Sequence, residues 1–154
     1  MIAAEVQFYD VIAFFHITAV VLAFGPTFAY GVFFATAGRM NPAALPAVGQ
    51  SVVTWGRTAQ RLSMLVILAS GIYLVADRWE FADFFASWGM AAIIALIALS
   101  EAYFIPTTKR FVAAAQAGDE AEVQAIAKQQ QAVGPLAGIL VVLTIYVMTA
   151  KPFL

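Results

Sequence analysis

Four long stretches of uncharged residues divide this chain, and each is comparable in length to the hydrocarbon thickness of a lipid bilayer. The first covers residues 11–38 and is interrupted only by His16, and the others cover residues 62–76, 84–100 and 132–150. A helix needs about 20 mostly apolar residues to cross a hydrocarbon core of about 30 Å, because each residue rises about 1.5 Å. The pattern therefore predicts four transmembrane helices.

Turn-forming and capping residues between these stretches set the expected ends of the helices. We expect transmembrane helices over about residues 7–38, 54–76, 83–105 and 132–150. Pro42 follows an asparagine, which is typical of a helix start, so residues 42–51 are expected to form a short helical connection. Gly118 followed by Asp119 is typical of one helix ending and another beginning, which predicts a helical connection over residues 107–131.

Together these elements predict an all-α fold and a single domain over residues 1–154. The connection between the second and third helices is short, which makes these two helices antiparallel neighbours. The fold class that follows is a polytopic membrane protein, an up-down-up-down four-helix transmembrane bundle. Proline removes a backbone hydrogen bond, so Gly25-Pro26 is expected to bend the first helix near its middle.

The composition supports a membrane environment and excludes several kinds of chemistry. Hydrophobic residues make up 63% of the chain and charged residues 11%, whereas soluble domains carry roughly 25% charged residues. There is no cysteine, which excludes disulfides, iron–sulfur clusters and thiolate metal sites. The chain has one histidine, so a site built from several histidines would need several copies of the chain. A homo-oligomer is therefore one of the assemblies that the sequence allows. The expected surroundings are a lipid bilayer, and we expect no nucleic-acid partner.

Basic residues are distributed unevenly between the two sides of the predicted bundle. Those in or near the connections at residues 42–51 and 107–131 are Arg39, Arg57, Arg61, Lys109, Arg110 and Lys128, whereas the opposite side has Arg78 and Lys151. Lysine and arginine are enriched on the cytoplasmic side of membrane proteins. We therefore expect cytoplasmic connections and both chain termini outside the cytoplasm.

Ionisable side chains within the spans are the first candidates for function, because they are costly in a bilayer and usually face the bundle interior. Glu101 and Arg61 are expected at about the same depth in neighbouring helices, where an ion pair would satisfy both. The pair could be structural. Alternatively, Arg57, Arg61 and Glu101 could line a site for an anion or a proton.

His16 is the second candidate, because an imidazole within a span can bind haem iron, relay protons or hydrogen-bond a neighbouring helix. Met90 is expected at a similar depth in the third helix and on the same helical face as Glu101. A thioether and an imidazole facing one cavity would suit a haem with His/Met axial ligation. Alternatively, Met90 is an apolar filler of the core.

Three segments of the chain resemble the small four-helix proteins of the CopD/HemJ-like superfamily. They are FFHITAVVLAFGPTFAYG in the first helix, RTAQRLSMLVILASGIYLV in the second, and SWGMAAIIALIALSEAYFIPTTKR in the third. The chain is most similar to an uncharacterised branch of predicted integral membrane proteins of the bacterial inner membrane. The resemblance covers most of the chain but depends on few individual residues.

The resemblance implies a possible cofactor. HemJ-type members are protoporphyrinogen oxidases that bind haem b through a histidine of the first helix, which His16 matches. They also have a functionally important lysine in the third helix, where this chain has Met90. This departure argues against the HemJ activity, although His16 and Met90 could still bind haem iron, with Arg57 or Arg61 near a propionate.

These observations lead to three hypotheses for function. The first is a small bacterial inner-membrane protein with a haem or redox role, in which His16 is the iron ligand. The second is a subunit of an ion or small-solute channel or transporter that uses His16, Arg61 and Glu101. The third is a structural membrane bundle. Whether the chain is an enzyme is left open by the sequence.

Overall fold

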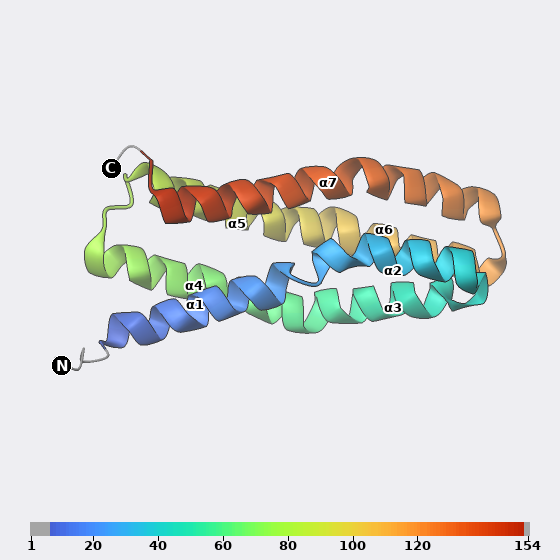
Figure 1. The fold of residues 1–154 in the computed structure, drawn as a ribbon, viewed down its shortest axis with the longest axis horizontal. Helices are drawn as coiled ribbons and strands as arrows, with labels where there is room; N and C mark the ends of the chain where they lie inside the picture. The colour runs from blue at the N-terminus through green and yellow to red at the C-terminus, as the bar shows by residue number, and fades with distance from the viewer. Residues whose placement is uncertain (1–6, 153–154) are drawn as a thin grey trace.

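The computed structural model describes residues 7–152, which are helical apart from short turns and contain no strand (Figure 1). The helical segments are, in order, α1 (Phe8–Phe24), α2 (Thr27–Met40), the 3-10 turn η1 (Pro42–Ala44), α3 (Leu45–Trp55), the π turn η2 (Gly56–Gln60), α4 (Arg61–Arg78), α5 (Phe84–Leu99), the π turn η3 (Ser100–Phe104), α6 (Ile105–Ala117) and α7 (Glu120–Ala150).

These segments join end to end into four long helices that run antiparallel to one another (Figure 1). The long helices are Phe8–Met40, Pro42–Arg78, Phe84–Ala117 and Glu120–Ala150, and each is long and apolar enough to cross a membrane. At 1.5 Å per residue they extend about 45–55 Å, which exceeds the roughly 30 Å of a hydrocarbon core. The predicted all-α, four-helix membrane bundle is confirmed.

The bundle has two ends that differ in what they carry. The terminal end, at the left of Figure 1, holds Phe8, Ala150 and the turn between α4 and α5. The far end, at the right, holds the turn at Asn41 and the turn at Gly118. The start of α1 and the end of α7 therefore lie at one end, as expected for an even number of spans.

The second and third long helices extend further toward the far end than the sequence predicted. The expected connection over residues 42–51 is continuous with the second span, because Pro42 and Pro46 lie in the first turns of their helices, where proline costs no hydrogen bond. Likewise, the third span continues past Pro106 to Ala117. These prolines start helical segments without interrupting the long helices.

The turn between α6 and α7 has the caps that the sequence predicted. Gly118 ends α6 in the left-handed conformation, with φ 72°, which a residue without a Cβ adopts at little cost. The Asp119 side chain then accepts a hydrogen bond of 3.0 Å from the backbone N–H of Glu122 and starts α7. A tight turn thus joins the third and fourth long helices.

Each long helix has an irregularity near its middle, and we call this level the irregular belt. The belt consists of the Gly25-Pro26 bend between α1 and α2, the π turns η2 and η3, and Pro135 inside α7. The bend between α1 and α2 is visible in Figure 1. Prolines and π turns leave backbone groups outside the regular helical pattern, and π turns are frequent at functional sites.

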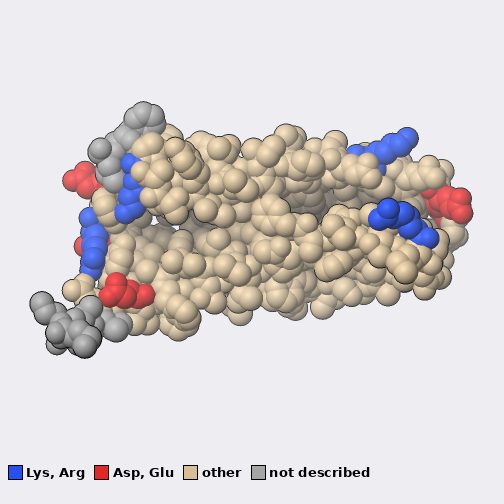
Figure 2. Space-filling view, in the orientation of Figure 1, with Lys and Arg blue, Asp and Glu red and all other residues tan. Residues whose placement is uncertain are grey.

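Apolar side chains dominate the outside of the molecule as well as its core. Only 11–22% of the residues in the most apolar window of each span are buried, and large side chains such as Phe14, Val21 and Ile94 are more than half exposed. In the view of Figure 2, charged residues gather at the two ends and leave the middle free of charge. A surface of this kind is suited to lipid, because water would not solvate it.

Candidate functional site

His16 lies on α1, the segment that packs most extensively against α4. Its Nδ1 atom is 2.9 Å from the hydroxyl oxygen of Ser70, and the ring also approaches the backbone of Ile67. Both residues are at least partly buried between the two helices. His16 is therefore held against the second span rather than directed toward the third.

The hydrogen bonds of Ser70 are compatible with a tautomer of His16 in which Nδ1 carries the proton. The Ser70 hydroxyl donates to the carbonyl oxygen of Val66, one turn earlier in α4. A serine hydroxyl has a single hydrogen to donate, so when that hydrogen goes to Val66, the Ser70 oxygen accepts from the Nδ1–H of His16. In the neutral imidazole this leaves a lone pair on Nε2, which makes no side-chain hydrogen bond with any described residue.

Gly71 provides the space that the imidazole occupies. A Cβ atom built on Gly71 would lie 3.4 Å from Cε1 and 3.8 Å from Nδ1 of His16. A larger side chain at this position would meet the ring. Ser70 and Gly71 therefore form the small-residue surface of α4 that receives His16. Ser70 hydrogen-bonds the imidazole, and Gly71 leaves space for it.

His16 and Met90 lie on helices that pack less extensively against each other than α1 packs against α4. Met90 lies on α5 and belongs to neither of the two core clusters. The residues of α5 that pack into the central core are Ile93 and Leu96. Ile97, which shares the helical face of Met90 and Glu101, packs against this core as well, and Met90 itself is partly buried. A cavity shared by His16 and Met90 therefore stays a prediction.

Arg61 and Glu101, by contrast, do meet. Arg61 Nε donates to Glu101 Oε1 at 2.8 Å and Arg61 Nη2 donates to Oε2 at 2.6 Å, which is a bidentate ion pair. Both residues lie about 25 Å from the terminal end, at 1.5 Å per residue. Glu101 belongs to the π turn η3 and Arg61 directly follows the π turn η2.

The position of this pair corrects one expectation. Charged groups in a span were expected to face the bundle interior, but the side chains of Arg61 and Glu101 are 45% and 39% exposed. Arg57, which adds positive charge near Glu101, is exposed as well. The pair therefore joins two helices across the outer surface of the molecule.

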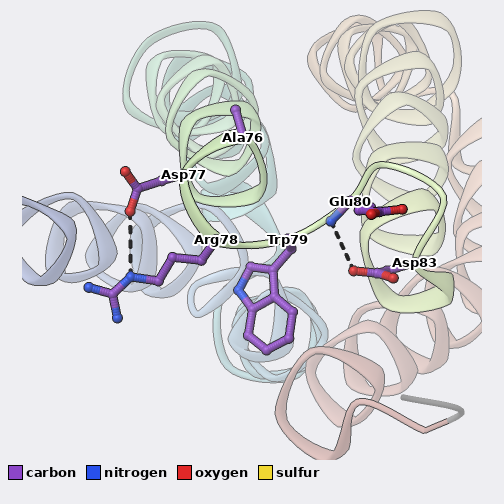
Figure 3. Close-up of a pocket in the computed structure, with 6 residues that line it drawn as sticks. All are labelled: Ala76, Asp77, Arg78, Trp79, Glu80 and Asp83. Atoms are coloured by element: carbon purple, nitrogen blue, oxygen red, sulfur yellow. Dashed lines mark hydrogen bonds and ion pairs between the residues drawn. The ribbon is translucent and has the colours of Figure 1, made fainter.

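A pocket at the terminal end is lined by several charged side chains (Figure 3). It has a volume of about 450 Å³ and is lined by the turn between α4 and α5, with Asp77, Arg78, Trp79, Glu80 and Asp83. Asp77 pairs with Arg78 at 3.4 Å, and Asp83 accepts a hydrogen bond of 3.0 Å from the backbone of Glu80. Asp77 and Asp83 thus bind groups of the same turn, which indicates that this pocket is part of a structured turn.

A second hollow of about 450 Å³ lies between α2 and α3 at the level of the irregular belt. Its lining is mostly apolar, yet it includes Tyr30 and Trp55, whose Oη and Nε1 atoms are buried without a hydrogen-bond partner. Neither this hollow nor the terminal pocket is lined by His16 or Met90.

No group of three or more His, Cys, Asp or Glu side chains that could hold a metal ion is found within residues 7–152. Comparison with known proteins gives no further guide, since no family model, curated protein or solved structure matches this chain. The geometry of His16 and its neighbours therefore carries the argument about function.

The sequence alone did not single out Ser70 and Gly71, the two residues of α4 beside His16, as site residues. Ser70 lies about 12 Å from the terminal end on α4, as His16 does on α1, at 1.5 Å per residue. Matching the depths of polar residues in antiparallel spans could have paired them. The unpartnered atoms of Tyr30 and Trp55 leave no such signal, because the sequence does not show which aromatic residues lack a partner.

Proposed function

We propose that this chain is a multi-pass protein of the bacterial inner membrane that binds haem b, with His16 as the protein ligand of the iron. The observation that carries this proposal is the hydrogen bond of 2.9 Å between His16 Nδ1 and Ser70 Oγ, inside a bundle with an apolar exterior. The similarity of the first helix to that of HemJ-type proteins supports it.

A haem suits this donor set better than a bare metal ion does. The porphyrin supplies four nitrogens to the iron, so one imidazole can complete a site. Histidines that bind metals usually donate their second N–H to a neighbouring group, which fixes the tautomer and the ring orientation. Ser70 would be that group for His16, and Nε2 would face the iron.

The other residues considered for this cofactor lie away from His16. Met90 lies on α5, whereas His16 is held in the contact between α1 and α4, and Arg61 is engaged by Glu101. Measured along α4 from Ser70, Arg61 lies about 13 Å and Arg57 about 20 Å away. Among residues 7–152 we therefore propose His16 as the protein ligand of the iron.

A bound haem would supply one-electron redox chemistry. The chain's own contribution would be to orient the imidazole and to keep water away from it. Next to His16 along α1, the buried Ala19 and Ala23 pack with Ile67 of α4 in the central core. Dry, apolar surroundings of this kind influence the redox potential of a haem.

The test is the visible spectrum of detergent-purified protein from cells with ample haem. We expect a Soret band that His16→Ala abolishes and that Met90→Leu leaves unchanged. Ser70→Ala should retain the band but weaken haem binding by about tenfold to a hundredfold, as is typical when the orienting partner of a metal ligand is lost.

Ser63→Ala is the matched control, because Ser63 is a buried serine of the same helix that makes no hydrogen bond to His16. It should bind haem like the unmodified protein. A colourless preparation that gains no Soret band after haem addition would reject haem binding altogether.

An ion or solute path through His16, Arg61 and Glu101 is our second hypothesis. It is weaker because the ion pair lies on the outer surface, and the buried Met64 and Ile67 lie between it and Ser70 along α4. Further polar groups would be needed between His16 and the Arg61–Glu101 pair to form a continuous path for an ion or solute.

A further inference from the structure

We propose that Arg57 and Lys109 form a surface site for the headgroup phosphate of an anionic membrane phospholipid. The two residues, which we call the basic edge, are exposed and lie on the second and third long helices. The basic edge is separate from His16 and does not depend on haem.

The two cations lie beside the contact between α3 and α6, which pack extensively against each other. A Cβ atom built on Gly56 would lie 3.5 Å from the side chain of Ile105, so these two residues face each other across the contact. Arg57 directly follows Gly56, and Lys109 lies four residues after Ile105 on the same side of α6. Because both side chains are exposed, they border the outer side of this contact.

The ion pair between Arg61 and Glu101 adjoins the basic edge without neutralising it. Arg61 lies four residues after Arg57 and reaches Glu101 across the outer surface of the same two long helices. Arg57 also adds positive charge near Glu101. The four side chains of this patch carry three positive charges and one negative charge, so positive charge is in excess.

The described part of the chain does not compensate this excess. Within residues 7–152, the basic side chains that form ion pairs with acidic ones are Arg61, Arg78 and Arg110. The basic edge therefore has no carboxylate partner in this range. An unpaired charge beside a bilayer is unfavourable, so we expect an anion from outside the chain to bind there.

The depth of the basic edge matches the level of lipid phosphates. At 1.5 Å per residue, Arg57 lies about 32 Å and Lys109 about 38 Å from the terminal end. The turn at that end carries Trp79 among charged side chains, which is typical of a membrane interface. A hydrocarbon core of about 30 Å that starts there ends just before the basic edge, and the headgroup region continues for about 5–8 Å.

The excess of positive charge favours an anionic headgroup over a zwitterionic one. A zwitterionic headgroup brings a cation together with its phosphate, whereas an anionic headgroup brings the phosphate without that cation. Guanidinium and ammonium groups donate strong hydrogen bonds to phosphate oxygens. Each basic residue near an anionic membrane surface strengthens binding by about fivefold.

The test compares two lipids that have the same acyl chains and differ in headgroup charge. Purified protein in a neutral detergent is titrated with phosphatidylglycerol or with phosphatidylcholine, and native mass spectrometry measures the affinity of each. We expect phosphatidylglycerol to bind roughly tenfold to thirtyfold more tightly, with a smaller preference at higher ionic strength. Arg57→Gln and Lys109→Gln should each reduce the preference by about fivefold, and the double variant should abolish it.

Two substitutions that remove the same charge elsewhere serve as matched controls. Arg39 lies near the end of α2, about 46 Å from the terminal end, and its Nε donates to the carbonyl oxygen of Ala35 at 3.2 Å. Lys151 lies at the terminal end, where its Nζ is 3.7 Å from the centre of the Trp79 ring. Arg39→Gln and Lys151→Gln should keep the full preference, although each changes the net charge as much as Arg57→Gln does.

Three results would overturn the proposal. Equal affinity of the unmodified protein for the two lipids would show that headgroup charge is not recognised, and this comparison does not depend on how any variant folds. An equal loss of preference in Arg39→Gln or Lys151→Gln would assign it to net charge alone. Displacement of phosphatidylglycerol by millimolar inorganic phosphate at constant ionic strength would assign the basic edge to a small soluble anion. All three results would be independent of the Soret test at His16.

Discussion

At the scale of single residues, the chain places its one histidine where two small residues of the neighbouring helix receive it. Ser70 contributes a hydrogen-bonding oxygen 2.9 Å from Nδ1, and Gly71 contributes the space for the ring. Helices in a membrane gain little from the hydrophobic effect between them, so small residues and hydrogen bonds have a large share in their association. His16 thus serves the packing of α1 on α4 whether or not it binds a cofactor.

The space at Gly71 leads to a prediction about stability. Alanine fits, since its Cβ would lie 3.4 Å from His16 Cε1, and replacing a glycine inside a helix by alanine favours the helix by about 0.5–1 kcal/mol. Gly71→Ala should therefore leave the free energy of unfolding unchanged or raise it slightly. Gly71→Leu should lower it, because the larger side chain displaces the imidazole and breaks its bond to Ser70.

Gly31 provides the comparison, because nothing lies within 4 Å of a Cβ built there. Gly31→Ala and Gly31→Leu should both be tolerated. Denaturation in detergent, followed by helical circular dichroism, measures all four variants. If Gly71→Leu were as stable as Gly31→Leu, the claim that Gly71 leaves space for the His16 ring would be rejected.

At the scale of elements, the two π turns and the ion pair between them form one feature. η2 directly precedes Arg61 and η3 contains Glu101, so the irregular parts of two neighbouring helices lie beside the same bidentate pair. A π turn inserts one residue into a helix and rotates the side chains that follow it. We infer that these turns set the direction in which the two charged groups meet, on the surface rather than in the core.

The pair can be tested by a double-mutant cycle in lipid nanodiscs. Arg61→Leu and Glu101→Leu should each lower the midpoint of thermal unfolding, because each leaves the other charge unpaired in apolar surroundings. The double variant should recover much of the loss, so the effects should be clearly less than additive. Both side chains are about two-fifths exposed, and in a nanodisc this exposed part faces lipid, which does not screen the charge that is left.

The Arg110–Glu122 pair is the matched control. It is also an exposed ion pair, but it joins α6 to α7 beside the turn at the far end. Water solvates an unpaired charge there, so Arg110→Leu and Glu122→Leu should have small and nearly additive effects. Additive losses for Arg61 and Glu101 as well would reject the view that they pair within apolar surroundings.

Features that depend on a few consecutive residues could be predicted from the sequence, whereas features that depend on how two helices pack could not. The four spans and the caps at Gly118 and Asp119 are local, so apolar pattern and residue type predicted them. The face of α5 was harder, because the sequence does not show where a π turn rotates a helix. The ideal helical period put Met90, Ile97 and Glu101 on one interior face. Ile97 does pack against the core, whereas Glu101, which belongs to the π turn η3, is 39% exposed. The hydrogen bond from His16 to Ser70 depends on how two spans pair, which one sequence does not show.

At the scale of the whole molecule, the charges and the length of the helices constrain how the bundle sits in a bilayer. The long helices extend about 45–55 Å and the hydrocarbon core measures about 30 Å, so part of the bundle lies outside that core. The far half carries more polar groups, including Arg39, Lys109, Arg110 and Lys128. We therefore expect that half to protrude from the membrane.

The orientation of the bundle is the last prediction. Arg57 and Arg61 lie within a continuous helix and not in a connection, so they count less toward the orientation than the sequence suggested. The four basic residues of the far half still outnumber Arg78 and Lys151 at the terminal end. Because basic residues favour the cytoplasmic side, the far end should be cytoplasmic and both termini should lie outside the cytoplasm.

Reporter fusions decide this orientation. A reporter that is active only in the cytoplasm should be active when inserted after Gly118 and inactive when fused after Leu154, and a periplasmic reporter should give the opposite result. Replacing Lys109, Arg110 and Lys128 by glutamine, with Arg78 and Lys151 kept, removes most of the bias and should give mixed orientation. Activity of the same reporter at both positions would contradict the even number of spans, whereas a clean exchange of the two results would leave the fold intact and reverse its orientation.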